Sequence, residues 1–103
     1  MKSLREVVQW LNGASRSDVS EKTICVREPW TSDSDARLVD LDEESQLPPD
    51  AETDGYKYFL EAFVAREVMD VLQQRPTESS TEDACRLLIY YAENDAYPDW
   101  VYR

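Results

Sequence analysis

The acidic run VDLDEE, residues 39–44, carries oxygen ligands at a spacing that could bind a metal ion. Asp40, Asp42 and Glu44 stand at alternate positions, as do the first ligands of an EF-hand calcium loop. Such a loop also needs a glycine at its sixth position and a glutamate at its twelfth, and this run has neither. We therefore expect a solvated strand edge and loop here, with at most a weak cation site, and no dedicated metal site.

The residue types that enzymes use most often are scarce in this chain. It has no histidine, which is the commonest general base and metal ligand, and its two glycines are too few for a phosphate-binding loop. Carboxylate pairs could serve a glycosidase, but 103 residues leave little room for a sugar cleft. We therefore expect neither an enzyme nor a bound cofactor.

The two cysteines, Cys25 and Cys85, match no metal or redox spacing. Each lies among apolar neighbours, which favours buried free thiols over a disulfide, as in a reducing cytoplasm. The N-terminal stretch does not have the charge pattern of a secretory signal, and no apolar run approaches the length of a membrane span. We therefore expect a cytoplasmic protein.

An excess of acids favours a basic protein partner. Twenty-two acids against eleven bases give a net charge of −11, and residues 17–54, with twelve acids and three bases, contribute −9 of it. A field of this sign repels phosphate backbones and anionic lipid and attracts basic partners. We expect no direct binding to nucleic acid or to membranes. The alternative is that the charge serves solubility alone.

Aromatic residues are the second group that could bind a partner. The rings of Trp10, Trp30, Tyr97, Trp100 and Tyr102 lie at the ends of predicted elements or outside them. They either cap the core while keeping a polar edge in water, or anchor a partner as hot spots. The candidate partner-binding residues are Asp33, Asp35, Asp40, Asp42, Glu43, Glu44, Asp95, Tyr97 and Trp100.

Hydrophobic periodicity predicts a single α+β domain over residues 1–103, in the order α-β-β-β-α-α. The expected elements are a helix over 3–13, strands over 22–28, 36–42 and 56–61, and helices over 64–75 and 81–94. The three strands should form a small antiparallel sheet with the helices on one side of it.

The strands and loops carry more detailed expectations. Alternation places Ile24 and Val26 on one face of the first strand, and Tyr56, Tyr58 and Leu60 together on one face of the third. The stretch EESQLPPDAETDG, residues 43–55, is predicted to be a loop because of its prolines and glycine.

Three stretches carry a resemblance to a known group of proteins. They are VDLDEESQLPPDAETDG, residues 39–55, GYKYFL, residues 55–60, and YYAENDAYPDW, residues 90–100. In these the chain resembles small acidic bacterial proteins, mostly of unknown function, that occur beside polymorphic toxins. The resemblance implies an immunity protein, a cognate inhibitor that protects a cell from a toxin passed between neighbours, as in contact-dependent growth inhibition.

We therefore expect an immunity protein that covers a basic toxin domain, most simply a nuclease. Acids of residues 33–54 would meet the Lys and Arg side chains that hold phosphate in the toxin, and rings would slow dissociation. One alternative is a nucleic-acid mimic or adaptor that regulates a host nucleic-acid-binding protein. Clustering of the acids in one stretch argues against a mimic. Another alternative is a housekeeping domain without a toxin partner.

Overall fold

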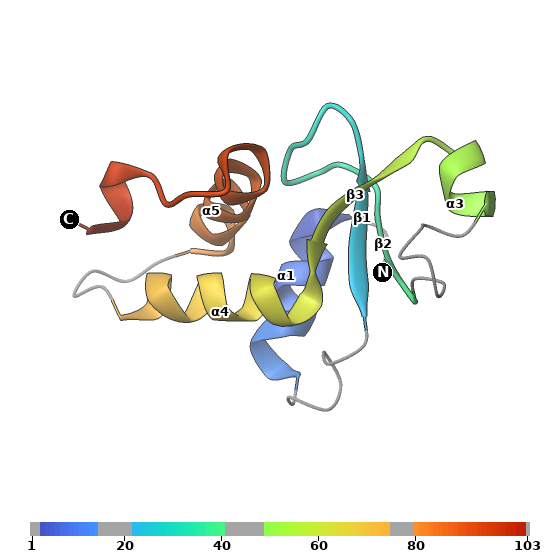
Figure 1. Cartoon of the computed structure of the whole chain (residues 1–103). Coiled ribbons are helices and arrows are strands. Elements are labelled where there is room, and N and C mark those ends of the chain that lie inside the picture. The colour runs from blue at the N-terminus through green and yellow to red at the C-terminus, as the bar shows by residue number, and fades with distance from the viewer. Residues whose placement is uncertain (1–2, 15–21, 41–48, 75–79, 103) are drawn as a thin grey trace.

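The computed structural model of the chain describes residues 3–14, 22–40, 49–74 and 80–102. Its fold is α+β, and the order of the main elements confirms the predicted α-β-β-β-α-α (Figure 1). The elements are α1 (Leu4–Gly13), β1 (Thr23–Arg27), β2 (Ala36–Val39), α3 (Pro49–Thr53), β3 (Tyr56–Glu61), α4 (Ala62–Gln73), α5 (Thr81–Asn94) and the 3-10 helix η1 (Asp99–Tyr102).

Local capping explains where the first and last long helices begin. The Ser3 hydroxyl accepts a hydrogen bond from the Glu6 backbone N–H at 3.2 Å and so caps α1. At α5 the Ser80 hydroxyl accepts from the Asp83 N–H, and the Asp83 carboxylate accepts from the Ser80 N–H, which completes a capping box. By contrast, α4 follows β3 directly at Ala62, two residues before the predicted start.

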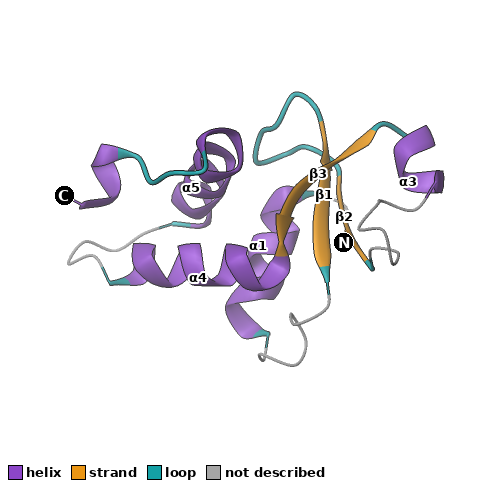
Figure 2. Ribbon diagram, viewed as in Figure 1, coloured by secondary structure: helices purple, strands orange, loops and turns teal. Residues whose placement is uncertain are grey.

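The sheet has the order β2-β1-β3, with β1 antiparallel to both neighbours. Helices α1, α4 and α5 lie on one side of it, and α3 lies on the other (Figure 2). Ile24 and Val26 face the main core, as predicted, whereas Cys25 packs with Ala51 of α3 and with Tyr56.

The prediction of a loop through residues 43–55 is wrong for α3, which adds a fourth α-helix on the side of the sheet opposite the three predicted helices. Pro49 begins α3, and proline suits the first helical position because its ring presets φ and no N–H is needed there. Ala51 is then 1% exposed, covered by the second face of the sheet. The second strand ends at Val39 and not at residue 42, although residues 41 and 42 lie outside the described part.

A bulge in β3 changes which side chains reach the main core. Cys25 pairs with Tyr58 and Ile24 pairs with Leu60, so Phe59 is the extra residue. As a result Phe59 and Leu60 both join the main core, while Tyr58 pairs with Cys25 on the opposite face. The prediction that Tyr58 and Leu60 share a face is therefore wrong.

Most of the large apolar side chains meet between the three long helices and the sheet. Cys85 is buried in this main core and Cys25 in the smaller cluster beside α3, and both are free thiols. Burial raises the pKa of both thiols, that of Cys85 to about 11. Among the described residues, none of the helices combines the length and the apolar character that a membrane span requires.

Candidate acidic cleft

The aspartates of the middle region that were predicted to meet a partner form ion pairs within the chain where the structure describes them. Asp33 is 3.3 Å from a guanidinium nitrogen of Arg5, and Asp35 is 3.3 Å from one of Arg27. Three further acidic candidates of the middle region, Asp42, Glu43 and Glu44, lie outside the described residues. The charge of this region is therefore partly compensated before any partner arrives.

Ion pairs also neutralise aspartates along the edge of the sheet towards α3. Asp40 is 3.1 Å from the ammonium of Lys22, and Arg37 lies between Asp50 at 3.5 Å and Asp54 at 3.3 Å. Pairs of this kind on exposed side chains contribute little to stability, but they lower the free charge that a partner meets.

The C-terminal candidates lie on a segment that runs back along α5. Tyr97 packs on Tyr91 with 5.3 Å between ring centroids, and Trp100 lies under the guanidinium of Arg86 at 5.4 Å. Tyr97 and Trp100 are both half-buried against the main core. These residues and Asp95 all lie on the segment that follows α5, which Figure 1 shows on the opposite side of the molecule from β2.

A surface cleft of about 380 Å³ lies between the β1–β2 connection and the C-terminal half of α5. It is lined by Glu28, Pro29, Trp30 and Glu93, and we call it the acidic cleft. Both glutamates are exposed, and neither has an ion-pair or hydrogen-bond partner among the described residues. Free carboxylates thus gather here, while most of the described aspartates are paired elsewhere.

Trp30 is held firmly in the wall of this cleft. Its indole N–H donates a hydrogen bond to the Val26 carbonyl at 3.2 Å. Its ring meets the buried ring of Phe59 edge-on, with centroids 4.9 Å apart and planes at 85°. The bulge in β3 supplies this support, because it turns Phe59 towards the main core. The ring is therefore presented in a fixed position and stays half-buried.

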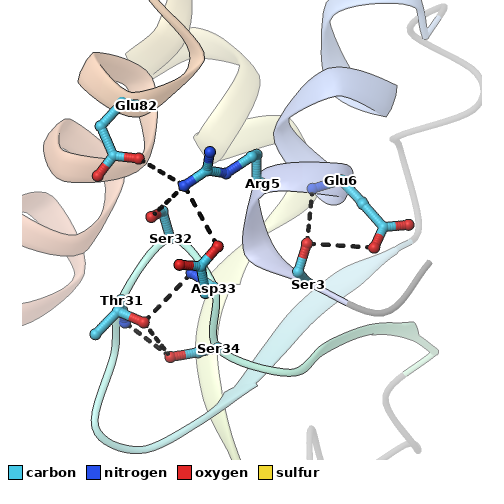
Figure 3. A network of polar contacts seen from close by, with 8 residues as sticks. All are labelled: Ser3, Arg5, Glu6, Thr31, Ser32, Asp33, Ser34 and Glu82. Carbon is cyan, nitrogen blue, oxygen red and sulfur yellow. Dashed lines mark hydrogen bonds and ion pairs between the residues drawn. The ribbon is translucent and has the colours of Figure 1, made fainter.

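A polar network around Arg5 holds the β1–β2 connection against two helices (Figure 3). One guanidinium nitrogen of Arg5 lies 2.9 Å from the Ser32 hydroxyl, 2.9 Å from a Glu82 oxygen and 3.3 Å from Asp33. Arg5 belongs to α1 and Glu82 to the first turn of α5, so one side chain joins three segments.

Backbone groups strengthen the same junction. The N–H groups of Leu4 and Arg5, at the start of α1, donate to the carbonyls of Ser34 and Ser32, both at 2.9 Å. The first N–H groups of a helix have no acceptor within the helix. These two bonds therefore satisfy donors that the Ser3 cap does not. The connection that carries Glu28 and Trp30 is thus fastened to the helical layer at several points.

The sequence matches the model of a protein family over residues 1–100, which includes every element that lines the acidic cleft. The chain belongs to the DUF7716 family. Its members are described as a domain of unknown function. A comparison with curated proteins found no match to this DUF7716 chain, and a comparison with solved structures found none either.

The end of α5 adds to the negative potential at the cleft of this DUF7716 domain. The C-terminus of a helix carries a partial negative charge, which cations in the last turn usually offset. Here the last turn has no basic residue and carries Glu93, and Asp95 follows it in the left-handed conformation with φ 52°. Among the described residues no group of three or more potential ligands could hold a metal ion.

Two of the residues that line the cleft were missed as candidates from the sequence. Glu28 and Glu93 lie far apart along the DUF7716 chain and come together only when the β1–β2 connection packs on α5. The one local signal was the absence of a base from the end of the last helix, where several acids stand.

Proposed function

We propose that the protein is an immunity protein, which binds a basic toxin domain in the cytoplasm and covers it sterically. The acidic cleft carries the proposal. There the free carboxylates of Glu28 and Glu93 lie beside the fixed ring of Trp30, at a helix end whose own charge is uncompensated. A nuclease is the toxin class that suits this surface best, because it needs Lys and Arg side chains to hold phosphate.

Charge and contact would act on different steps of binding. The net charge of −11 attracts a basic domain over distance and raises the association rate. The cleft would then contribute direct contacts that slow dissociation. Tyr90, which is 40% exposed one turn before Asn94 on α5, extends the aromatic surface near Glu93.

The partner can be captured from the native host with a tagged, cross-linked form of the protein and then purified. We expect a basic domain whose nuclease activity falls to background when one equivalent of the protein is added. The association rate should fall steeply with added salt, because long-range attraction is screened. A captured nuclease that stays fully active in the complex contradicts the proposal, and a host nucleic-acid-binding protein would support the adaptor alternative.

Two sets of charge variants then separate steering from contact. Neutralising the acids at the end of β2 should slow association and leave dissociation nearly unchanged, since they act through long-range charge. Replacing Glu28 and Glu93 by glutamine should also speed dissociation. Glu67→Gln is the matched control, because Glu67 is exposed on α4 and does not line the cleft. The acids to neutralise at the end of β2 are Asp40, Asp42, Glu43 and Glu44.

A further inference from the structure

We infer that the acidic cleft receives one arginine side chain of the basic partner, an inference that rests on the function proposed above. Sites for small ligands measure roughly 300–1,000 Å³. At about 380 Å³, this cleft suits a single long side chain better than a large ligand. Its free carboxylates require that side chain to be cationic.

The chemistry of the wall favours arginine over lysine. A guanidinium is planar and can lie on the face of Trp30 while its several N–H groups donate to two carboxylates. Glu28 and Glu93 come from different segments, so one fork of donors could serve both. A lysine ammonium is a compact, strongly hydrated charge that gains less from the ring.

The protein builds the same arrangement with its own arginines elsewhere. The guanidinium groups of Arg27 and Arg37 lie 5.2 and 4.7 Å from the ring centroid of Tyr56. Each of these arginines is also paired with an aspartate, Asp35 for the first and Asp54 for the second. A ring beside carboxylates is therefore a guanidinium site in this molecule. The acidic cleft also places a ring beside carboxylates. Among the described residues, no lysine or arginine forms an ion pair with those carboxylates.

Two further features fit a cationic occupant. The last turn of α5 places its negative end beside Glu93, so a guanidinium there would relieve an unfavourable interaction as well as form new ones. Trp30 is already fixed by Val26 and Phe59, so little side-chain freedom would be lost on binding.

The test titrates the ¹⁵N-labelled protein with three capped tripeptides, acetyl-Gly-X-Gly-amide, in which X is arginine, lysine or citrulline. Citrulline has the shape of arginine without its charge. We expect the arginine peptide to shift the indole N–H signal of Trp30 and the amide signals next to Glu28 and Glu93. The lysine peptide should bind several-fold more weakly, and the citrulline peptide should leave these signals unchanged.

Variants locate the binding. Glu28→Gln with Glu93→Gln should weaken binding of the arginine peptide by about tenfold, whereas Glu67→Gln should not change it. The inference is overturned if citrulline shifts the same signals, if the double variant binds like the wild type, or if the shifts spread evenly over all exposed acids.

This result is separable from the proposed function. Inhibition of a nuclease by the protein, together with no arginine binding in the cleft, would reject the cleft as the arginine site and keep the immunity function. Arginine binding in the cleft, together with a captured nuclease that stays active, would reject the immunity function and support the cleft.

Discussion

Replacing Arg5 by alanine should lower the free energy of unfolding by about 1–2 kcal/mol. The hydrogen bond to Ser32, a largely buried hydroxyl, should account for about 1 kcal/mol. The pairs with Asp33 and Glu82 lie on side chains that are about half exposed, so together they should add no more than about 1 kcal/mol. The buried Nε of Arg5 has no hydrogen-bond partner among the described residues, and its removal offsets part of the loss.

Urea unfolding followed by tryptophan fluorescence measures this change, and a thermal melt should show a drop of roughly 5–15 °C. A double-mutant cycle with Glu82→Gln isolates one pair, for which we expect a coupling of about 0.5–1 kcal/mol that shrinks in high salt. Lys22→Ala is the control, because it removes one exposed ion pair, with Asp40, and should cost less than about 0.5 kcal/mol. The reasoning fails if Arg5→Ala costs no more than this control.

Three further changes should act through single, local causes. The free energy of unfolding should fall by on the order of 2 kcal/mol as pH rises from 9 to 11. Burial raises the pKa of the Cys85 thiol to about 11, so the folded thiol stays neutral while the unfolded thiol ionises. Cys85→Ala should flatten this pH dependence in urea unfolding. Asp95→Gly should stabilise the free protein by about 1 kcal/mol in the same assay, since it removes a left-handed non-glycine residue and a carboxylate from a helix C-terminus. Trp100→Ala should destabilise the protein by about 2 kcal/mol, because the ring packs on the core and under Arg86; a faster partner off-rate with an unchanged melting curve would instead identify the ring as an anchor.

Features of the fold with short-range causes were predictable from the sequence. The cap at Ser80 and the alternation through Ile24 and Val26 each depend on a few neighbouring residues, and the elements they mark lie where expected. The bulge at Phe59 was not predictable in this way. It lies in an aromatic run where both faces of the strand are partly covered, so no polar residue marks the change of face.

The short helix α3 was missed because proline and glycine dominate its surroundings. Pro49 counted as a loop signal in the sequence, whereas in the structure it begins the helix, and only the burial of Ala51 against the sheet distinguishes this helix from a loop. That burial depends on Cys25 and Tyr56, which lie outside the stretch itself.

The acidic cleft was harder to predict, because a carboxylate is available to a partner only if it forms no ion pair within the folded chain. Sequence indicates how many acids a region holds but not which of them meet a base. Asp33 is paired by Arg5 of α1, and Asp40 by Lys22 across the sheet. Glu28 and Glu93, which the sequence did not single out, have no such partner among the described residues. Free charge is thus a property of the folded chain.

The contact between α1 and α5 joins nearly opposite ends of the chain. During translation, α1 leaves the ribosome before α5 is made, so the apolar face of α1 stays uncovered by α5 until then. Val7 and Val8 are fully buried in the finished fold, and a nascent chain that lacks α5 cannot cover them in the same way. Local contacts such as the β1–β2 hairpin can form earlier. Completion of the core therefore requires α5, and a nascent chain that lacks it exposes the apolar face of α1, which favours chaperone contact.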